Sequence, residues 1–269
     1  MSGFSPEWLA MRENHDLRAR NAEVVECVAE RFAHLPSMTV VDIACGTGAT
    51  RRALAPHLPR PQHWHLIDND LSLLARAGAM PSPAGCTTRT IPVDLAHDLE
   101  VALDCAPDLI ACSALLDLVS GEWLERLATE CAARRLPLYA ALTYNGVVAL
   151  EPFDKHDPDI VAAVNHHQLG DKGFGPALGP NAAQTLIELC NSVGYDTISG
   201  PADWLIRPED NDMQRALITQ WAQVAEEMGA LPTAAIASWL ARRITTIDAG
   251  DLTIRVGHTD VFAVPTDTR

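Results

Sequence analysis

The sequence lacks any uninterrupted apolar run of the roughly 18 residues that a membrane-spanning helix requires. Residues 1–21 also lack the apolar core of a signal peptide, because charged side chains interrupt that segment throughout. These two absences argue against a secreted chain and against a membrane-embedded one. We therefore expect a cytoplasmic protein that does not associate with membranes.

No C-x-x-C pair occurs among the seven cysteines, whose number is odd and whose spacing is scattered. This pattern suits reduced thiols in a cytoplasm better than a disulfide framework or a structural zinc site. His166, His167 and Asp171 come nearest to a ligand cluster, but adjacent histidines point apart and no third strong ligand is well spaced. We therefore expect no metal ion.

Positive charge is in the minority, with 20 Lys and Arg residues against 35 Asp and Glu residues and a formal net charge of −15. Such a surface repels phosphate backbones and anionic headgroups, so the composition disfavours tight binding of nucleic acids. Repeats and low-complexity tracts are also absent. Hydrophobic residues make up 48% of the 269 positions, which suits one large domain or one domain with a lid.

Strand-like and helix-like patterns alternate along the first half of the chain. Residues 1–38 are predicted to be helical. A first helix is expected to start at Ser5, and helical structure resumes near His15 and runs to about His34. Beyond them, alternation at this spacing implies βαβ units in a parallel, doubly wound sheet whose strands are apolar throughout. The predicted strands are residues 39–43, 63–67, 88–93, 108–112 and 137–143, and residues 49–58 are predicted to form the helix after the first of them.

After Tyr144 the regular alternation lapses, because prolines and glycines crowd residues 145–180. We predict a short helix near residues 157–167 and an ordered functional loop or lid in the rest of this insert. The remaining predicted elements are a helix at 181–193, a strand within 195–207, a helical addition at 208–250 and a last strand at 252–264.

A glycine-containing turn joins the first predicted strand to the next helix, in the sequence V-V-D-I-A-C-G-T-G over residues 40–48. Glycines there let the backbone approach a ligand and turn sharply into a helix N-terminus. A dinucleotide fingerprint would read G-x-G-x-x-G, but Ala44 stands at the first glycine position and the third glycine is missing. Asp42 would repel a pyrophosphate, whereas it can meet a cationic group of a ligand.

The stretch resembles motif I of class I S-adenosylmethionine-dependent methyltransferases, in which an acid precedes alternating small residues as D-x-[GA]-x-G-x-G. Asp42, Ala44, Gly46 and Gly48 match this motif, and the superfamily tolerates alanine at the first small position. The resemblance implies an α/β Rossmann-like fold with a doubly wound, seven-stranded, mostly parallel sheet. It also implies helical substrate-covering additions, all within one domain spanning residues 1–269, and S-adenosylmethionine as the cofactor.

Three further strand ends fall where the resemblance predicts them. Asp68 ends the second strand, where an acid can accept hydrogen bonds from both ribose hydroxyls. The resemblance implies that Asp94 meets the adenine amino group beside Leu95, and that Ser113 and Ala114 border the methionine moiety and the methyl group. The predicted cofactor contacts are Asp42, Ala44, Cys45, Gly46, Gly48, Asp68, Asn69, Asp94, Leu95, Ser113 and Ala114.

Each of these features has an ordinary alternative when it is taken alone. A lone G-x-G is a common turn, and single aspartates at strand ends are more often helix caps or turn residues. Their ordered occurrence at successive strand ends favours the cofactor interpretation, because ligands of open α/β sheets bind at the carboxyl ends of the strands.

Methyl transfer to the acceptor is expected to need little catalytic assistance from side chains, because the methyl group of a sulfonium is already electrophilic. Holding the nucleophile in line can suffice, with a base only where the nucleophile loses a proton. Residues 165–176 form the most concentrated polar cluster and follow the fifth strand. There we predict His166 or His167 as a base, Lys172 as the partner of a substrate carboxylate and Phe174 as a cover. A solvated loop whose histidines cap a helix is the alternative.

The resemblance and the acidic surface together favour methyl transfer to a small-molecule acceptor at O, N or C. One alternative is a cofactor-binding protein without transfer, such as a sensor or a partner subunit. A nicotinamide-dependent oxidoreductase is disfavoured by Asp42 and the missing glycine. A nucleic-acid methyltransferase is disfavoured by the net charge and by the lack of an Asn-Pro-Pro-Tyr type sequence. The apolar faces of the helices near Met213 and Trp239 predict core packing or a homodimer interface.

Overall fold

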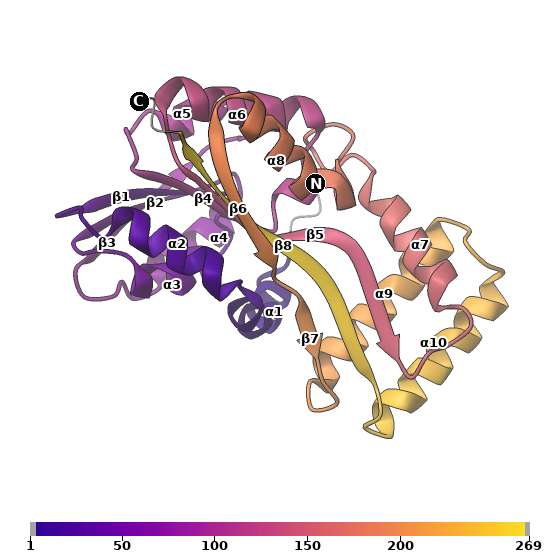
Figure 1. The fold of residues 1–269 in the computed structure, drawn as a ribbon. Helices are drawn as coiled ribbons and strands as arrows, with labels where there is room; N and C mark the ends of the chain where they lie inside the picture. The colour runs from indigo at the N-terminus through magenta and orange to yellow at the C-terminus, as the bar shows by residue number, and fades with distance from the viewer. Residues whose placement is uncertain (1–3, 267–269) are drawn as a thin grey trace.

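The computed structural model describes residues 4–266 and has a mixed eight-stranded sheet at its centre (Figure 1). The strand order is β3-β2-β1-β4-β5-β8-β6, and β7 pairs with β8. Strands β1 to β5 are parallel, whereas β8 is antiparallel to β5, β6 and β7. This arrangement confirms the predicted Rossmann-like sheet. The strands are β1 (Met38–Ile43), β2 (Gln62–Asp68), β3 (Cys86–Pro92), β4 (Leu109–Ser113), β5 (Leu138–Glu151), β6 (Tyr195–Pro201), β7 (Trp204–Ile206) and β8 (Thr253–Pro265).

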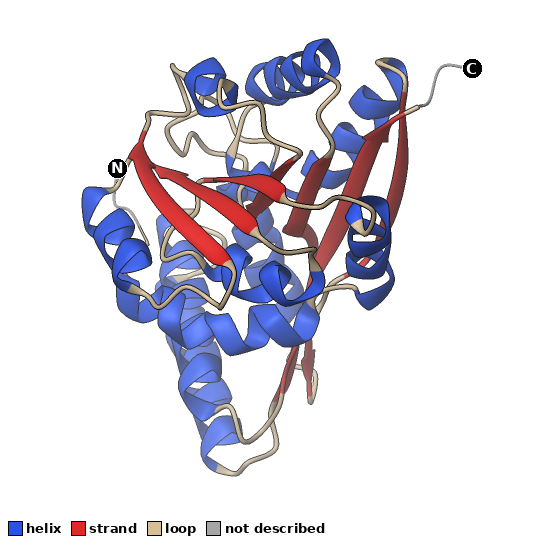
Figure 2. Cartoon of the chain, turned by 90° about the vertical axis from the view of Figure 1, so that its left-hand side faces the viewer, coloured by secondary structure: helices blue, strands red, loops and turns tan. Residues whose placement is uncertain are grey.

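Helices cover both faces of this sheet, as the view in Figure 2 shows. Among the described residues, no helix combines the length and the apolar character needed to cross a bilayer. The α-helices are α1 (Pro6–Ala19), α2 (Ala22–Phe32), α3 (Ala49–Leu54), α4 (Leu71–Ala79), α5 (Leu99–Leu103), α6 (Gly121–Arg134), α7 (Asp157–Gln168), α8 (Ala182–Ser192), α9 (Asn211–Glu227) and α10 (Thr233–Asp248). Short 3₁₀ turns are η1 (Ala55–His57), η2 (Leu116–Leu118) and η3 (Gly179–Asn181).

The residues of β1 show how the sheet divides the core into two layers. Val41 and Ile43 point to the face covered by α5, α6 and α8, whereas Met38 and Val40 point to the face covered by α2, α3 and α4. All four side chains are at most 1% exposed, because the central strands are covered on both sides. Parallel pairing sets Val41 opposite His65 of β2 and Ile110 of β4, so the carboxyl ends of these strands lie together.

Strands β5 and β8 continue well beyond the rest of the sheet and carry a third hydrophobic core. Their distal halves, together with β7, pack against α7, α9 and α10, which lie beside this extension in Figure 1. Leu150, Trp204, Trp221, Trp239 and Ile254 are among its buried side chains. The apolar faces predicted for the late helices therefore form core within this helical extension.

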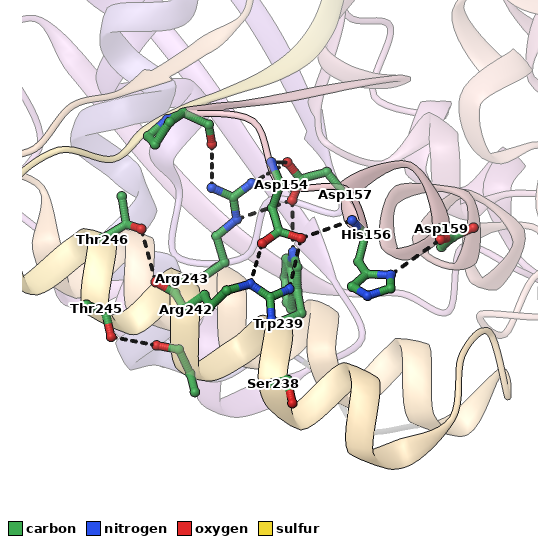
Figure 3. A network of polar contacts seen from close by, with 12 residues as sticks. Asp154, His156, Asp157, Asp159, Ser238, Trp239, Arg242, Arg243, Thr245 and Thr246 are labelled. Atoms are coloured by element: carbon green, nitrogen blue, oxygen red, sulfur yellow. Dashed lines mark hydrogen bonds and ion pairs between the residues drawn. The ribbon is translucent and has the colours of Figure 1, made fainter.

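An ion-pair network between α7 and α10 stabilises the helical extension (Figure 3). The carboxylate of Asp157 pairs with the buried guanidinium of Arg243 and accepts a 2.8 Å hydrogen bond from Trp239 Nε1. Arg243 Nη1 also donates to the carbonyl oxygen of Pro152 at 2.6 Å. A second, more exposed pair joins Arg242 to Asp154. The buried guanidinium and carboxylate thus satisfy one another at the helix interface.

Several predicted boundaries are wrong. Helix α1 is continuous to Ala19 and does not resume near His15. The break falls at Arg20, after which Asn21 caps α2 by accepting a hydrogen bond from the N–H of Val24. Strand β5 runs on to Glu151, so residues 145–151 are strand where we expected the start of a lid, and bulges accommodate its bend.

Two more predicted elements are interrupted. The helix predicted for residues 49–58 gives way after Leu54 to the 3₁₀ turn η1, because Pro56 cannot donate the next helical hydrogen bond. The strand expected within residues 195–207 is two strands, β6 and β7, and this raises the strand count from the predicted seven to eight.

Candidate functional site

The turn after β1 holds three alternate residues in the left-handed region of backbone conformation. The φ angles of Ala44, Gly46 and Gly48 are 52°, 54° and 80°, respectively. Between them, the N–H of Cys45 donates to the carbonyl oxygen of Ile67 at 2.9 Å, which ties the turn to β2. Left-handed backbone costs an L-residue with a side chain about 1–2 kcal/mol, so this conformation explains why small residues alternate in the motif.

The carboxylate of Asp68, at the end of β2, bonds to this turn. Its Oδ2 accepts a 2.8 Å hydrogen bond from the N–H of Gly46, and its Oδ1 accepts one from the N–H of Asp70 at 3.0 Å. A carboxylate has about four acceptor positions, so each oxygen keeps a lone pair for another donor. The adjacent Asn69 is exposed. Asp68 is therefore fixed in place with acceptor capacity left over.

Asp42, at the end of β1, is fully buried, and neither of its carboxylate oxygens has a hydrogen-bond partner among the described residues. Burial raises the pKa of Asp42 to about 7, although the nearby Thr50 hydroxyl and the positive charge of Arg20 act in the opposite direction. Arg20 follows α1 and donates from Nη2 to Ser113 Oγ at 2.8 Å and from Nη1 to the Tyr139 hydroxyl at 3.2 Å. Its Nε is buried and unpartnered among the same residues. A carboxylate and a guanidinium with spare bonding capacity thus lie near one another beneath α1.

At the end of β3, Asp94 is exposed and shapes the following turn. Its carboxylate accepts a 3.1 Å hydrogen bond from the N–H of Ala96 and lies 3.1 Å from His97 Nδ1. Leu95 is buried, and its carbonyl oxygen accepts a 2.6 Å hydrogen bond from Trp123 Nε1. Asp94 is therefore a turn residue in this structure whose carboxylate also remains open to solvent.

At the end of β4, Ser113 lies at the centre of a small polar network. Its hydroxyl accepts hydrogen bonds from Arg20 Nη2 and, at 3.0 Å, from Thr50 Oγ1. The next residue, Ala114, has a φ of 50° and donates its N–H to the carbonyl oxygen of Ala141 at 2.9 Å. A second left-handed alanine therefore ends β4, as Ala44 does after β1.

Helix α1 lies directly over the turn after β1. Leu9 Cδ1 is 3.4 Å from the position that a Cβ would occupy at Gly46. Glu13 pairs with Arg52 of α3 at 2.5 Å, and Arg52 Nη1 donates to the carbonyl oxygen of Thr47 at 2.6 Å. These contacts make α1 one wall of any site at the strand ends.

A second polar group lies where α1 meets the helical extension. Arg12 forms a 3.0 Å ion pair with Asp16, and its guanidinium lies 4.9 Å from the ring centroid of Trp204. Trp204 Nε1 donates to Asp16 Oδ1 at 2.9 Å. Arg12 and Asp16 are both buried, so each charge is satisfied by the other.

Asp117 and His258 are buried beside this pair, and each has an unpartnered polar atom within the described part of the chain. Asp117 is 6% exposed with a free Oδ1, and His258 is 4% exposed with a free Nδ1. Burial raises the pKa of Asp117 to about 6 and lowers that of His258 to about 3, and the positive charge of Arg12 lowers the pKa of both groups. The Tyr144 ring lies 6.1 Å from that of His258, and its hydroxyl donates to Asn165 Oδ1 at 2.7 Å.

The structure brings two of the three predicted catalytic residues together, and it places them against α9. Lys172 Nζ donates to the carbonyl oxygen of His167 at 3.0 Å and lies 3.5 Å from its Nδ1. The nearby carboxylate of Glu227 acts on both groups, while burial and the charge of Lys172 lower the pKa of His167. His166 is exposed. Within residues 4–266, none of the three has a hydrogen bond or ion pair to Asp42, and their catalytic role stays a prediction.

The rest of the predicted loop is ordered by its own contacts. Asp171 accepts hydrogen bonds from the N–H groups of Gly173 and Gly175 at 2.6 and 3.1 Å. Phe174 packs edge to face against Trp123 of α6, with 5.4 Å between ring centroids. Phe174 therefore anchors the loop on the sheet's helical layer.

Arg20, Asp117 and His258 were not predicted as site residues. Arg20 lies within the N-terminal segment that the sequence predicts to be helical, and no local pattern there indicates that its side chain reaches Ser113, 93 residues away. For Asp117 there is a local signal, since it is a polar residue between two leucines. His258 lies beside Gly257, Thr259 and Asp260, so nothing local distinguishes it. Across the described residues, no group of three or more His, Cys, Asp or Glu side chains is arranged to hold a metal ion.

No protein-family model matches the sequence, and the search of curated proteins finds no relative. Among solved structures, a cyclopropane-fatty-acyl-phospholipid synthase-like protein from Lactobacillus casei has a TM-score of 0.52 at 15% identity, covering 97% of this chain and 94% of that one. A candidate methyltransferase from Bacillus halodurans has a TM-score of 0.50 at 13% identity, covering 91% and 100%. Identities this low concern the fold alone. The chain has the Rossmann-like fold of class I S-adenosylmethionine-dependent methyltransferases.

Proposed function

We propose that the chain binds S-adenosylmethionine at the carboxyl ends of β1 to β4 and transfers its methyl group to a small-molecule acceptor. The observation that carries this proposal is the fully buried carboxylate of Asp42, which lacks a hydrogen-bond partner among the described residues. A buried charge without a partner is costly, so a cationic ligand group is the expected complement. When bound, the cofactor supplies both an ammonium group and an electrophilic sulfonium methyl.

The surrounding residues fit the remaining parts of this cofactor. Asp68 keeps acceptor capacity for the ribose hydroxyls, while Gly46 and Gly48 allow close approach of the backbone. The accessible carboxylate of Asp94 suits the adenine amino group, and the neighbouring Leu95 suits its ring. These roles follow the strand-end pattern of the fold's cofactor site.

Arg20 adds a contact for the carboxylate of the methionine moiety. Its guanidinium is held by Ser113 and Tyr139, so its orientation is fixed before a ligand arrives. Its buried, unpartnered Nε leaves donor capacity for an anion. With Asp42 and Arg20, the site offers one charge of each sign to a zwitterionic amino-acid group.

Two observations support a small acceptor. The chain carries a net charge of −15, which disfavours nucleic acids, and α1 and the helical extension flank the strand ends. The alternative with the same cofactor is binding without transfer, as in a sensor or a partner subunit. Nicotinamide binding is disfavoured because Asp42 would face a pyrophosphate.

Methyl transfer is tested with S-adenosylmethionine labelled in the methyl group. The chain is incubated with a protein-free small-molecule extract, with tRNA and with duplex DNA, and the label is then counted in each. We expect label in the small-molecule fraction alone. Label in RNA or DNA would overturn the small-molecule assignment, and tight cofactor binding with no label in any fraction would favour a sensor.

A further inference from the structure

Asp117 and His258 have spare bonding capacity that the proposed cofactor contacts do not use. Both are more than nine-tenths buried, yet Asp117 Oδ1 and His258 Nδ1 have no hydrogen-bond partner among the described residues. Most buried polar atoms in proteins are paired, so two unpaired ones beside the same cation indicate a ligand surface. They come from different elements, η2 after β4 and the strand β8, which converge at Arg12 of α1.

The charges around these two atoms leave a negative excess. Arg12 is neutralised by Asp16, whose carboxylate also accepts a hydrogen bond from Trp204. Burial keeps His258 neutral at physiological pH, because its pKa falls to about 3. Asp117 Oδ1 has no hydrogen-bond partner within residues 4–266, and the nearby Arg12, whose charge acts on Asp117, is already paired with Asp16. A buried site of this charge repels carboxylates and phosphates and favours a cation.

Aromatic rings line the same place. The rings of Trp204 and His258 lie 4.8 Å apart, and Tyr144 and Trp8 extend this row at 6.1 and 6.4 Å from His258 and Trp204, respectively. Aromatic faces attract ammonium groups and pack well against flat apolar ligands. The guanidinium of Arg12, 4.9 Å from the Trp204 ring, shows that this row already accommodates one cation.

We propose that Asp117, Tyr144 and His258 form the acceptor subsite and that the acceptor is an amine bearing an apolar or aromatic group. The inference rests on the proposed methyl transfer. The bound ammonium first loses a proton, which frees the nitrogen's lone pair, and this pair then forms the new N–C bond while the methyl C–S bond breaks with its electron pair left on sulfur. Asp117 takes the proton that the nitrogen loses. A carboxyl group with a pKa of about 6 is suited to this role near neutral pH.

The inference is tested by binding before it is tested by turnover. The full chain, saturated with S-adenosylhomocysteine, is titrated by calorimetry with benzylamine, benzyl alcohol and benzoate, which share one ring and differ in charge. We expect benzylamine to bind at least about tenfold more tightly than the other two. In the same comparison, Asp117→Asn removes this preference while its affinity for S-adenosylhomocysteine stays unchanged. Asp98→Asn, at an exposed carboxylate, serves as the matched control.

The outcomes distinguish a failure of the proposed function from a failure of the amine subsite. If S-adenosylhomocysteine does not bind the wild type, the proposed function fails. If it binds but benzoate equals or exceeds benzylamine, if no probe binds at millimolar concentration, or if Asp117→Asn keeps the amine preference, the amine subsite is refuted. Methyl transfer to benzylamine that is lost in Asp117→Asn, with its cofactor affinity intact, would support the proton-accepting role.

Discussion

Asp68 accepts a hydrogen bond from the N–H of Gly46 at 2.8 Å, so the acid assigned to the ribose also fixes the turn after β1. Asp68→Ala should therefore remove the ribose acceptor and loosen the turn together. We expect the affinity for S-adenosylhomocysteine to fall by about 10- to 100-fold, since a hydrogen bond to a charged group contributes about 1.5–3 kcal/mol. Calorimetry measures this loss. Asp98→Ala is the control, and an unchanged affinity in Asp68→Ala would refute the ribose assignment.

Arg20→Met should separate recognition of the amino-acid part of the cofactor from recognition of its nucleoside part. The substitution keeps an apolar stem but removes the guanidinium proposed to bind the methionine carboxylate. We expect S-adenosylhomocysteine to bind about 10- to 100-fold more weakly. Methylthioadenosine, which lacks the carboxylate, should bind the variant and the wild type equally well. Equal losses for both ligands would point to a purely structural role for Arg20.

The pKa of Asp42, raised to about 7 by burial, makes cofactor affinity depend on pH. A cationic ligand stabilises the ionised form, so its binding releases a proton when the free protein is protonated. We expect the affinity for S-adenosylmethionine to rise between about pH 6 and about pH 8 and then level off. Calorimetry in buffers of different ionisation enthalpy should detect the proton release. Asp42→Asn should abolish both effects, and a pH-independent affinity in the wild type would contradict this account.

The same shift has a consequence for the ligand-free protein. Between the ordinary pKa of an aspartate, near 4, and the raised value near 7, the folded chain binds more protons than the unfolded chain. The contribution of Asp42 to stability therefore falls as the pH rises through this interval. Urea unfolding at several pH values should show a smaller loss of stability over this range in Asp42→Asn than in the wild type.

The strand-end acids could be predicted because each lies within a few residues of a recognisable strand. Asp42, Asp68 and Asp94 all lie at or just after a strand's carboxyl end, and parallel pairing brings such ends together. Arg20 and His258 could not be predicted in this way, because their partners are distant in sequence. The bend of β5 was missed for a related reason, since the register shifts beyond Ala140 arise from pairing with β8.

Arg243→Met tests the buried ion pair of Figure 3. Removing the guanidinium leaves the carboxylate of Asp157 buried without a charged partner, which typically costs about 3–5 kcal/mol. The free energy of unfolding, measured in urea, should fall by that amount. Arg242→Met is the matched control from the adjacent, more exposed pair and should cost at most about 1 kcal/mol. Equal costs would show that burial does not distinguish the two pairs.

Lys172→Ala tests the predicted role of the loop over residues 165–176. The side chain donates to the carbonyl oxygen of His167, so its loss should perturb the loop and leave the cofactor site intact. If the loop acts on the acceptor, turnover should fall while the affinity for S-adenosylhomocysteine stays the same. Normal turnover in this variant would remove the main support for a catalytic loop and leave Asp117 as the proposed proton acceptor.

The central claim is that the site after β1 binds S-adenosylmethionine, and calorimetric titration of the full chain tests it most directly. S-adenosylhomocysteine and NADH are titrated separately under identical conditions. The account predicts one equivalent of S-adenosylhomocysteine bound with micromolar affinity, and no binding of NADH. Saturable binding of NADH, with no heat from S-adenosylhomocysteine at millimolar concentration, would contradict it.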